Sequence, residues 1–317
     1  MLAKIKKTII DLLFFICKSK LGYFVVYNSF ELFEKLTNYS IQKRSFRILK
    51  GYKLNLKNPK SFNEKICWRK IYDHNPLFPK IVDKYKVNDY LIKKLGKKEA
   101  ENIIIPLYHV TDKPKTIPFD KLPDEYIIKA NHGSGTNIFV FNEKDINKKQ
   151  IIKQCKNWLK EPYGIFRHEW AYQKIKRKII IQKLIRDKEG NIPKDFKFHV
   201  FHGKTFMIQV NEGLFFDKEN RTLTLFTPEW KKFDLFWEFK PNIHVDKPKN
   251  FKKMLMLAEK LAEDFDYVRV DLYDLGDEIK FGELTIYPTS GQAKVNPKSF
   301  DFKVGENWTL PRKGEHK

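Results

Sequence analysis

Hydrophobic and polar residues alternate in two segments near the C-terminus, residues 268–273 and 281–286. Alternation with a period of two predicts β-strands, and the short segment 276–278 between them predicts the turn of a hairpin. A three-residue loop there pairs Leu275 with Ile279, Tyr273 with Phe281 and Asp271 with Glu283. The predicted hairpin therefore places two carboxylates opposite each other, with Cβ atoms roughly 5 Å apart.

Asp271 and Glu283 lie on the polar face of this hairpin, together with Arg269 and Thr285. The other face is apolar and is expected to be buried: Val268, Val270, Leu272, Leu284 and Ile286. Two opposed carboxylates repel each other unless a cation lies between them. Oxygen ligands at this spacing suit Mg²⁺, which takes one or two protein carboxylates and completes its shell with phosphate oxygens and water. The alternative is a solvated strand face on which Arg269 neutralises one acid.

A second polar segment, residues 131–136, lies between two apolar runs. The first run predicts a strand that carries Lys129 near its end, and a second strand is expected from about Asn137. Gly133 and Gly135 let backbone N–H groups approach an anion closely, and Lys129 adds a positive charge. The pattern is not a P-loop, because the G-x-x-x-x-G-K-[ST] sequence is missing and a strand follows. The segment is a candidate phosphate site, and the alternative is an ordinary hairpin turn.

Helical patterns occupy much of the rest of the chain. Ser61 and Glu64 predict a capping box at the start of a helix that runs to Tyr72. Further helices are expected over residues 79–95, 145–159, 170–176 and 249–265. Gly96 is expected to end the first of these.

Asp195, Lys197 and His199 alternate with apolar residues ahead of a predicted turn at His202 and Gly203. The alternation places the three polar side chains on one face of a strand. Asp195 is then placed to orient Lys197. The alternative is a half-exposed hairpin without a special role.

Composition narrows the class of protein. The 317 residues have room for one large or two modest domains, and a hydrophobic content of 42% supports a buried core. The formal charge of +23 favours anionic partners such as a nucleotide, an acidic glycan, a membrane surface or nucleic acid. No nucleic-acid-binding module is recognisable, which argues against the last of these. The three scattered cysteines, Cys17, Cys67 and Cys155, indicate a reducing compartment.

The N-terminal segment predicts a basic amphipathic helix. Its apolar face consists of Ile5, Ile9, Leu12, Leu13 and Ile16, and lysines surround it at Lys4, Lys6, Lys7, Lys18 and Lys20. The apolar run is interrupted by Asp11 and is too short to span a bilayer. The pattern favours an anchor on an anionic inner membrane leaflet, and the alternative is a helix docked on the body of the protein.

Six short motifs occur in order between about Asn58 and Leu310. They are residues 58–65 (Asn-Pro-Lys-Ser-Phe-Asn-Glu-Lys), 82–85 (Val-Asp-Lys-Tyr), 128–135 (Ile-Lys-Ala-Asn-His-Gly-Ser-Gly), 195–198 (Asp-Phe-Lys-Phe), 269–271 (Arg-Val-Asp) and 281–285 (Phe-Gly-Glu-Leu-Thr). This set resembles the TupA-like (teichuronopeptide-biosynthesis-like) branch of the ATP-grasp enzymes, found with bacterial surface-polysaccharide genes. The resemblance implies an α+β fold in which a small antiparallel lobe and a larger C-terminal antiparallel sheet hold the nucleotide, preceded by a helical N-terminal region.

The resemblance also implies which residues contact ATP. The residues implied to contact the phosphates are Lys129 and the loop residues His132, Gly133, Ser134 and Gly135. Lys84 is implied to make a further contact with ATP. The segment Gln182, Lys183 and Leu184 matches the linker that recognises adenine. Gln182 stands where relatives are expected to carry a glutamate, so an adenine contact at this position would be made by an uncharged amide.

Metal-binding and catalytic positions are implied in the same way. Asp271 and Glu283 match the metal-binding acids, and Thr285 stands where many ATP-grasp ligases carry a metal-binding Asn. Lys197 and Arg269 match basic positions near the transferred phosphate, with Asp195 beside Lys197.

Four regions are implied: a basic helical region over residues 1–57, a helical segment over 58–124, a small lobe over 125–186 and a C-terminal lobe over 187–317. With ATP and Mg²⁺ as cofactors, the implied enzyme is a cytoplasmic or membrane-peripheral ligase that joins an amine or amino acid to a uronic-acid-type carboxylate through an acylphosphate. The acceptor would be an anionic glycan or its lipid-linked precursor, in the biosynthesis of a capsule or other surface polysaccharide.

The alternative is a sugar phosphotransferase or glycosyltransferase of the same pathway. Asp264-Phe265-Asp266 matches the D-x-D pattern with which nucleotide-sugar enzymes hold a metal. That pattern falls at the end of a predicted helix, where a short acidic turn is common.

Overall fold

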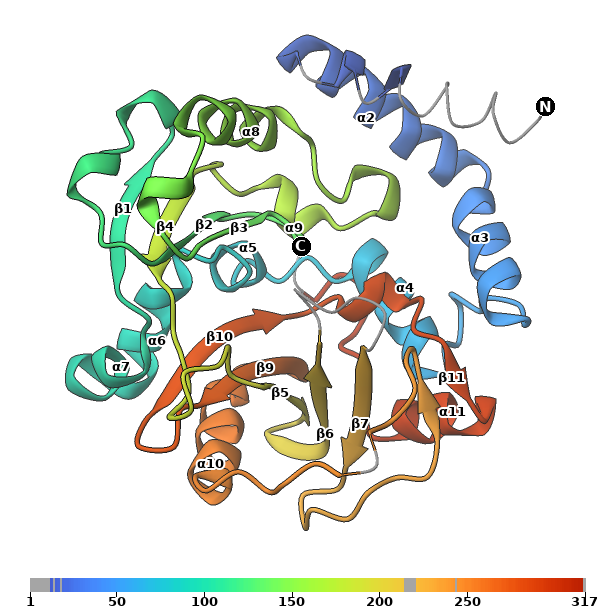
Figure 1. The fold of residues 1–317 in the computed structure, drawn as a ribbon. Coiled ribbons are helices and arrows are strands. Elements are labelled where there is room, and N and C mark those ends of the chain that lie inside the picture. Colours follow the sequence, from blue (N-terminus) through green and yellow to red (C-terminus); the bar gives the residue numbers. More distant parts are fainter. Residues whose placement is uncertain (1–11, 14, 18, 214–220, 243, 316–317) are drawn as a thin grey trace. The chain divides into compact units, whose positions relative to one another are not determined.

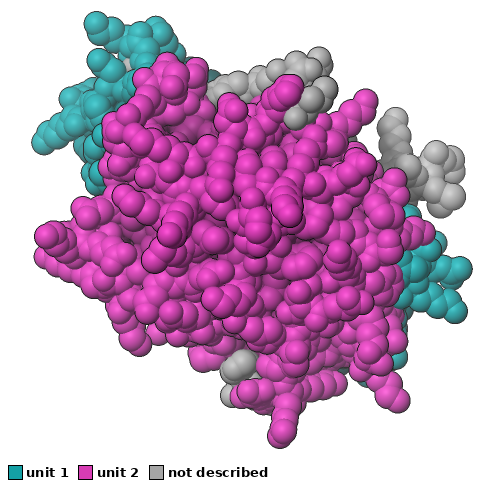
Figure 2. Space-filling view, turned by 90° about the horizontal axis from the view of Figure 1, so that it is seen from below, with its two compact units in different colours: residues 1–53, 106–184 teal, residues 54–105, 185–317 magenta. Residues whose placement is uncertain are grey.

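The structure is a computed structural model that describes residues 12–13, 15–17, 19–213, 221–242 and 244–315 (Figure 1). The chain divides into two compact units, which Figure 2 distinguishes by colour. Unit 1 comprises residues 1–53 and 106–184, and unit 2 comprises residues 54–105 and 185–317. The chain therefore passes from one unit to the other three times.

Unit 1 contains a four-stranded antiparallel sheet with the strand order β1-β4-β2-β3. The strands are β1 (Leu107–Thr111), β2 (Tyr126–Ala130), β3 (Asn137–Val140) and β4 (Ile179–Lys183). Strands β2 and β3 form a hairpin around residues 131–136, so the predicted strand after the glycine-bearing loop is confirmed.

Unit 1 also contains the helices α2 (Lys20–Leu36), α3 (Ser40–Lys50), α8 (Lys148–Lys160) and α9 (Trp170–Gln173). Short 3-10 helices are η1 (Pro114–Thr116), η2 (Phe119–Lys121), η3 (Glu143–Asp145) and η4 (Ile165–Arg167). Ile151, Cys155 and Trp158 recur at helical spacing on α8 and join the core formed by the sheet.

Unit 2 contains a five-stranded antiparallel sheet with the strand order β10-β9-β5-β6-β7. The strands are β5 (Asp195–Phe201), β6 (Lys204–Glu212), β7 (Thr222–Phe226), β9 (Tyr267–Asp274) and β10 (Ile279–Thr285). A second pair consists of β8 (Phe236–Trp237) and β11 (Val295–Asn296). Helix α10 (Phe251–Ala262) packs against β9 and β5 and buries Met254, Ala258 and Leu261.

The remaining helices of unit 2 are α4 (Phe62–Tyr72), α5 (Phe78–Ile81), α6 (Val87–Leu95), α7 (Lys97–Ile103) and α11 (Lys298–Glu306), with the 3-10 helix η5 (Pro288–Gly291). The capping box predicted for α4 is confirmed. The Ser61 hydroxyl accepts from the Glu64 amide at 3.1 Å, and the Glu64 carboxylate accepts from the Ser61 amide at 3.0 Å. Together with the antiparallel sheets, these helices confirm the predicted α+β class.

The segment 79–95 is not the single helix that its pattern predicts. Helix α5 ends at Ile81 and α6 begins at Val87. Between them the Asp83 carboxylate accepts from the backbone amides of Tyr85 at 2.9 Å and Lys86 at 3.3 Å. This local side-chain turn competes with helical hydrogen bonding and interrupts the helix.

The predicted register of the C-terminal hairpin is partly wrong. Phe281 pairs with Leu272 instead of Tyr273, and a bulge at Gly282 shifts the register by one residue. Beyond the bulge Glu283 pairs with Asp271, as predicted. The extra residue in the bulge, Gly282, thus restores the predicted pairing at Asp271 and Glu283.

The predicted amphipathic helix over residues 1–20 falls largely outside the described residues. Leu12, Leu13 and Ile16 of its apolar face are described, and Leu12 and Ile16 are exposed. Among the described residues, no helix has both the length and the hydropathy needed to cross a membrane. All three cysteines are free and buried.

Candidate active site

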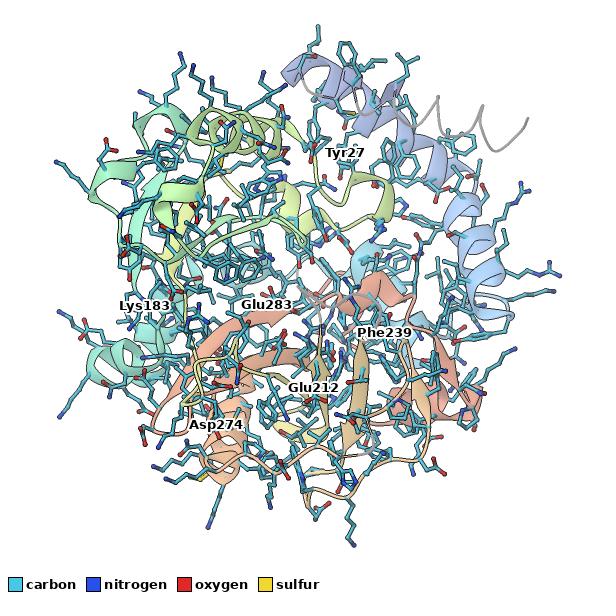
Figure 3. The ribbon with its side chains drawn as sticks, in the orientation of Figure 1. Tyr27, Lys183, Glu212, Phe239, Asp274 and Glu283 are labelled. Atoms are coloured by element: carbon cyan, nitrogen blue, oxygen red, sulfur yellow. The ribbon has the colours of Figure 1, made fainter. Side chains whose placement is uncertain are left out.

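The polar face of the β9–β10 hairpin carries the opposed acids Asp271 and Glu283. Figure 3 labels Glu283. Gly282 allows the two strands to approach here, because a Cβ at this position would lie 3.0 Å from the Asp271 carbonyl oxygen. The predicted apolar face is fully buried, but Asp271, Arg269 and Thr285 on the polar face are buried as well. This face is therefore not a solvated strand surface.

Arg269 lies between the two acids. Its Nε donates to Oδ1 of Asp271 at 2.7 Å, and its Nη2 donates to Oδ2 of Asp271 at 2.7 Å and to Oε1 of Glu283 at 3.1 Å. The same Nη2 also lies 3.0 Å from the Thr285 hydroxyl oxygen. The guanidinium fork is a rigid bidentate partner for carboxylates, so Arg269 neutralises both acids and fixes their separation.

Two lysines extend this ion-pair network. Lys197 on β5 pairs across the sheet with Asp271, and its Nζ donates to Oδ2 of Asp271 at 2.6 Å and also to Asp195. Lys84, from the turn between α5 and α6, lies 3.5 Å from Oε2 of Glu283. Three cations and three carboxylates, all from unit 2, thus form one connected cluster.

The cluster shifts the pKa values of four of its members, Glu283, Lys197, Arg269 and Asp195. Burial opposes ionisation of Glu283, but Lys84, Arg269 and Lys197 outweigh it and lower the pKa to about 2. Burial also opposes the charges of Lys197 and Arg269, yet neighbouring carboxylates raise the pKa of both. For Asp195, burial raises the pKa, and the charge of Asp271 adds to that effect. Of the three predicted catalytic residues, Lys197 and Arg269 contact the predicted metal-binding acid Asp271 directly. Asp195 is linked to it through Lys197.

The donor set fits a hard divalent cation. A carboxylate offers about four lone-pair sites, and Asp271 uses three of them for Arg269 and Lys197. The Glu283 side chain is 36% exposed, and its Oε2 meets only the 3.5 Å contact with Lys84 among the ion pairs that the structure describes. Within the described residues no group of three or more His, Cys, Asp or Glu side chains is arranged to hold a metal. If the cluster binds Mg²⁺, Asp271 and Glu283 would supply the one or two carboxylates that this ion usually takes.

Lys129 and the glycine-bearing loop form a separate cluster in unit 1. The Nζ of Lys129 donates to Oε1 of Gln182 at 3.2 Å, so two predicted ATP contacts lie side by side on β2 and β4. Gly133 and Gly135 both adopt positive φ angles, of 73° and 78°. A Cβ on Gly133 would lie 2.5 Å from the Tyr163 ring, whereas nothing lies within 4 Å of that position on Gly135. Gly133 thus permits close packing of Tyr163 against the loop. At Gly135 no protein atom fills the space next to the backbone.

Asn131 anchors this loop, a role that the sequence patterns do not reveal. The side-chain Nδ2 of Asn131 donates to the Lys176 carbonyl oxygen at 3.1 Å, and the side-chain Oδ1 accepts from the backbone N–H of Lys178 at 2.7 Å. The adjoining His132 is buried. Fixing the start of the loop limits how far its backbone N–H groups can reorient, which favours anion binding.

The predicted adenine-binding segment lies at the end of β4. Lys183 donates its backbone N–H to the Pro106 carbonyl oxygen at 2.9 Å, and Leu184 is buried. The sequence-predicted residues thus fall into two groups. Lys129, the loop from His132 to Gly135 and the segment 182–184 belong to unit 1, whereas Lys84 and the ion-pair network belong to unit 2.

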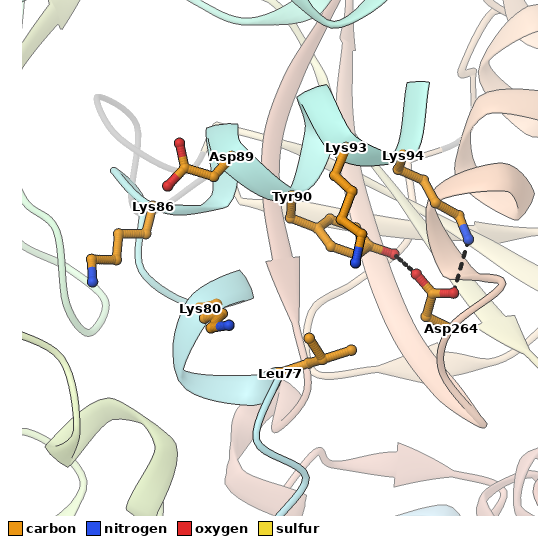
Figure 4. A pocket seen from close by; sticks show the side chains of 8 residues that line it. All are labelled: Leu77, Lys80, Lys86, Asp89, Tyr90, Lys93, Lys94 and Asp264. Carbon is orange, nitrogen blue, oxygen red and sulfur yellow. Dashed lines mark hydrogen bonds and ion pairs between the residues drawn. The ribbon is translucent and has the colours of Figure 1, made fainter. Parts of the chain in front are cut away.

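Each unit has a cavity of its own. In unit 1 a cavity of about 870 Å³ is lined by Ser134 and Gly135 of the loop and by Tyr163, Phe166 and Arg167. In unit 2 a cavity of about 610 Å³ has Leu77 and Tyr90 in its wall (Figure 4). Four lysines, Lys80, Lys86, Lys93 and Lys94, and two acids, Asp89 and Asp264, line it as well, so the charged residues of the lining are mostly positive. The chemistry of this second cavity suits a ligand that carries negative charge.

The acids of the D-x-D pattern have structural partners. Asp264 accepts from the Tyr90 hydroxyl at 2.9 Å and from Lys94 at 2.9 Å. Asp266 accepts from the Trp308 indole at 2.7 Å and from Arg69. These contacts favour a structural role for both acids over the metal site of a nucleotide-sugar enzyme.

His199, on the same strand as Lys197, predicts a measurable pH dependence. It is buried between Tyr267, whose hydroxyl lies 3.0 Å from Nδ1, and Gln209, whose Oε1 lies 3.3 Å from Nε2. Burial, reinforced by Arg269, lowers the pKa of His199 to about 3. Between pH 6.5 and 3 the unfolded chain gains a proton here and the folded chain does not. We expect this group to lower the free energy of unfolding by about 1.4 kcal/mol for each pH unit of acidification across that window.

Urea unfolding of the wild type and of His199→Gln at pH 7, 5 and 4 measures this contribution. The wild type should lose stability more steeply on acidification than the variant. His244→Gln, at an exposed position, serves as the matched control and should keep the wild-type slope. Parallel slopes for the wild type and His199→Gln would show that His199 takes up its proton equally in both states.

Comparison with known proteins places the chain in a family. Residues 64–309 match the family described as TupA-like ATPgrasp. No curated protein matches the chain. Among solved structures, a D-alanine–D-alanine ligase from Bacillus anthracis complexed with ATP is similar, with a TM-score of 0.41, 15% identity and coverage of 71% of this chain and 61% of the other. The ATP-grasp ligase PsnB complexed with a minimal precursor has a TM-score of 0.35, 11% identity and coverage of 65% and 52%.

The chain thus spans between half and about three fifths of the length of these solved structures. The family match begins at Glu64 and covers the rest of α4, the glycine-bearing loop, the four-stranded and five-stranded sheets and the ion-pair network. The chain belongs to the TupA-like ATP-grasp family.

Proposed function

We propose that the protein is an ATP-dependent carboxylate–amine ligase that acts in the biosynthesis of a bacterial capsule or another surface polysaccharide. Family membership supports an ATP-grasp enzyme with ATP and Mg²⁺ as cofactors. One observation carries the proposal furthest. Arg269 and Lys197 are buried, positively charged and held in place by the two acids that would bind the metal.

The chemistry of such a ligase builds up negative charge twice. A carboxylate of the acceptor attacks the γ-phosphate of ATP, which yields an acylphosphate and ADP, and an amine then displaces phosphate to form an amide. Mg²⁺ bound at Asp271 and Glu283 would neutralise phosphate charge. Lys197 and Arg269 act beside it as positive charges that are already oriented, so they need not reorganise as the transition state forms.

The cluster in unit 1 supplies the remaining nucleotide contacts in this proposal. Lys129 and the backbone of residues 132–135 bind phosphate oxygens, and Gln182 contributes to recognition of the base. Asp195 keeps the ammonium of Lys197 pointed toward Asp271. No side chain of the protein has to act as a nucleophile, because the acceptor carboxylate is the attacking group.

The acceptor is proposed to be a uronic-acid-type carboxylate on an anionic glycan or its lipid-linked precursor, and the amine donor to be an amino acid or another small amine. The lining of the cavity in unit 2 carries four lysines and two acids, and this positive balance supports an anionic acceptor. Because ATP is supplied in the cytoplasm, the reaction is placed there or on the inner face of the cytoplasmic membrane.

Incubation of the purified protein with Mg-ATP, a uronic-acid oligosaccharide and a mixture of amino acids tests the proposal. We expect release of ADP and phosphate only when acceptor and amine are both present, together with a product whose mass matches loss of one water from the pair. ADP with a phosphorylated oligosaccharide would favour a phosphotransferase. Consumption of a nucleotide sugar without ATP would overturn the ligase assignment.

A further inference from the structure

Helix α2 is apolar on its outer side as well as on its inner side. The inner side, with Tyr23, Tyr27 and Phe30, is partly buried, and Figure 3 labels Tyr27 on it. The outer side carries six large apolar residues that are 49–78% exposed: Leu21, Phe24, Val25, Leu32, Phe33 and Leu36. A helix that is apolar all round normally has both sides covered. Among the residues that the structure describes, none covers the outer side of α2 in this way.

Neighbouring segments extend this surface. Phe15 precedes α2 and is exposed, and Ile41, Ile48 and Leu49 on α3 are exposed as well. Figure 1 shows α2 and α3 following each other as consecutive rods at one side of unit 1. We call the exposed residues of α2 and α3, together with Phe15, the outer helical surface.

The charges on the outer helical surface have a single sign. Lys35, Arg44 and Arg47 are exposed on it. Residues 19–53 contain only two acids, Glu31 and Glu34, and both are directed toward His168. Glu31 lies 2.7 Å from Nδ1 of His168, and Glu34 lies 3.3 Å from Nε2 and also accepts from the backbone amides of Ile41 and Gln42. The surface therefore combines apolar side chains with cations and presents no carboxylate.

This combination indicates what covers the surface. A second copy of the chain would bring like charges together, because a two-fold interface places the same patch on both subunits. An anionic lipid bilayer offers negative headgroups for the cations and an acyl boundary for the leucines and phenylalanines. We propose that α2 and α3 lie on the surface of an anionic membrane, with the outer helical surface in contact with the lipid. This proposal is independent of the chemistry proposed for the active site.

Vesicle binding by the full-length protein tests the proposal. We expect co-sedimentation with vesicles of phosphatidylglycerol and phosphatidylcholine at a partition coefficient at least about tenfold higher than with phosphatidylcholine alone. The triple variant Leu21→Gln, Leu32→Gln, Leu36→Gln changes side chains that are 58–78% exposed, so it should fold normally and lose at least about tenfold in partition. Arg44→Gln with Arg47→Gln should reduce binding to the anionic vesicles and leave the weak binding to neutral vesicles unchanged.

Met256→Gln on α10 is the matched control, because Met256 is 65% exposed and lies in unit 2. It should bind vesicles like the wild type. Equal partition of the wild type and the triple variant would overturn the proposal. So would a concentration-dependent dimer in sedimentation equilibrium that the triple variant abolishes, since the surface would then join two copies of the chain.

Discussion

Asp271→Asn is expected to lower ATP-dependent turnover by about 10³-fold, a loss typical of removing one preorganised charge from an active site. Asparagine keeps the shape of the side chain but removes the negative charge that pairs with Arg269 and Lys197. The metal would lose one of its two carboxylates, and both cations would lose the partner that holds them in position. Turnover measured as phosphate release under saturating Mg-ATP reports the loss.

Asp277→Asn provides the matched control for Asp271→Asn. Asp277 lies in the turn of the same hairpin and is exposed, with Lys188 at 2.6 Å as its ion-pair partner. This variant should keep wild-type turnover. ATP titration in the presence of EDTA separates the effects further, because Asp271→Asn should retain metal-independent nucleotide binding through unit 1. Full activity of Asp271→Asn would refute the metal-site assignment.

Arg69→Met is expected to lower the free energy of unfolding by about 3–5 kcal/mol, because it leaves the buried carboxylate of Asp73 without its ion-pair partner. Arg69 on α4 has no exposed side-chain surface and lies 3.2 Å from Asp73. It donates to the Tyr267 carbonyl oxygen at 2.7 Å and also pairs with Asp266. Its guanidinium lies 4.4 Å from the centroid of the Trp308 ring, so the variant also loses a cation–π contact.

Urea denaturation of Arg69→Met measures this loss. Lys97→Met is the matched control, since the exposed Lys97 is 3.9 Å from Glu101 and such surface pairs contribute little. Its unfolding free energy should stay within about 0.5 kcal/mol of the wild type. Equal stabilities for the two variants would show that the contacts of Arg69 do not hold α4 against the sheet of unit 2.

Local patterns predict elements of this fold well where one short-range interaction decides the outcome. The capping box at Ser61 and Glu64 needs only residues three apart, and the alternation in β5 and β9 needs only a period of two. The break between α5 and α6 was not predicted, because Asp83 is a residue that helices tolerate. Only its bonds to the amides of Tyr85 and Lys86 show that it ends the helix, and that break is what brings Lys84 to Glu283.

The candidate site shows the same limit. The sequence predicted that Asp271 lies opposite Glu283. The pairing that it predicted near the turn was wrong, and the bulge at Gly282 restores the predicted pairing at the two acids. A glycine in a strand is compatible with a bulge but does not specify one. The position of Arg269 between both acids depends on side-chain rotamers. The anchoring of the loop by Asn131 depends on Lys176, which lies 45 residues later in the chain and just before β4. Neither is encoded in a periodicity.

The three crossings of the chain between units have a consequence for protein synthesis. Arg69 bonds to a residue 198 positions later. At translation rates of about 5–20 residues per second, α4 leaves the ribosome roughly 10–40 s before β9 exists to receive it. Throughout that interval Phe62 lacks the ring of Tyr267 that covers it, and α4 lacks its later packing partners η5 and α11. The apolar residues of α4 are therefore exposed to aggregation until these C-terminal segments have been made.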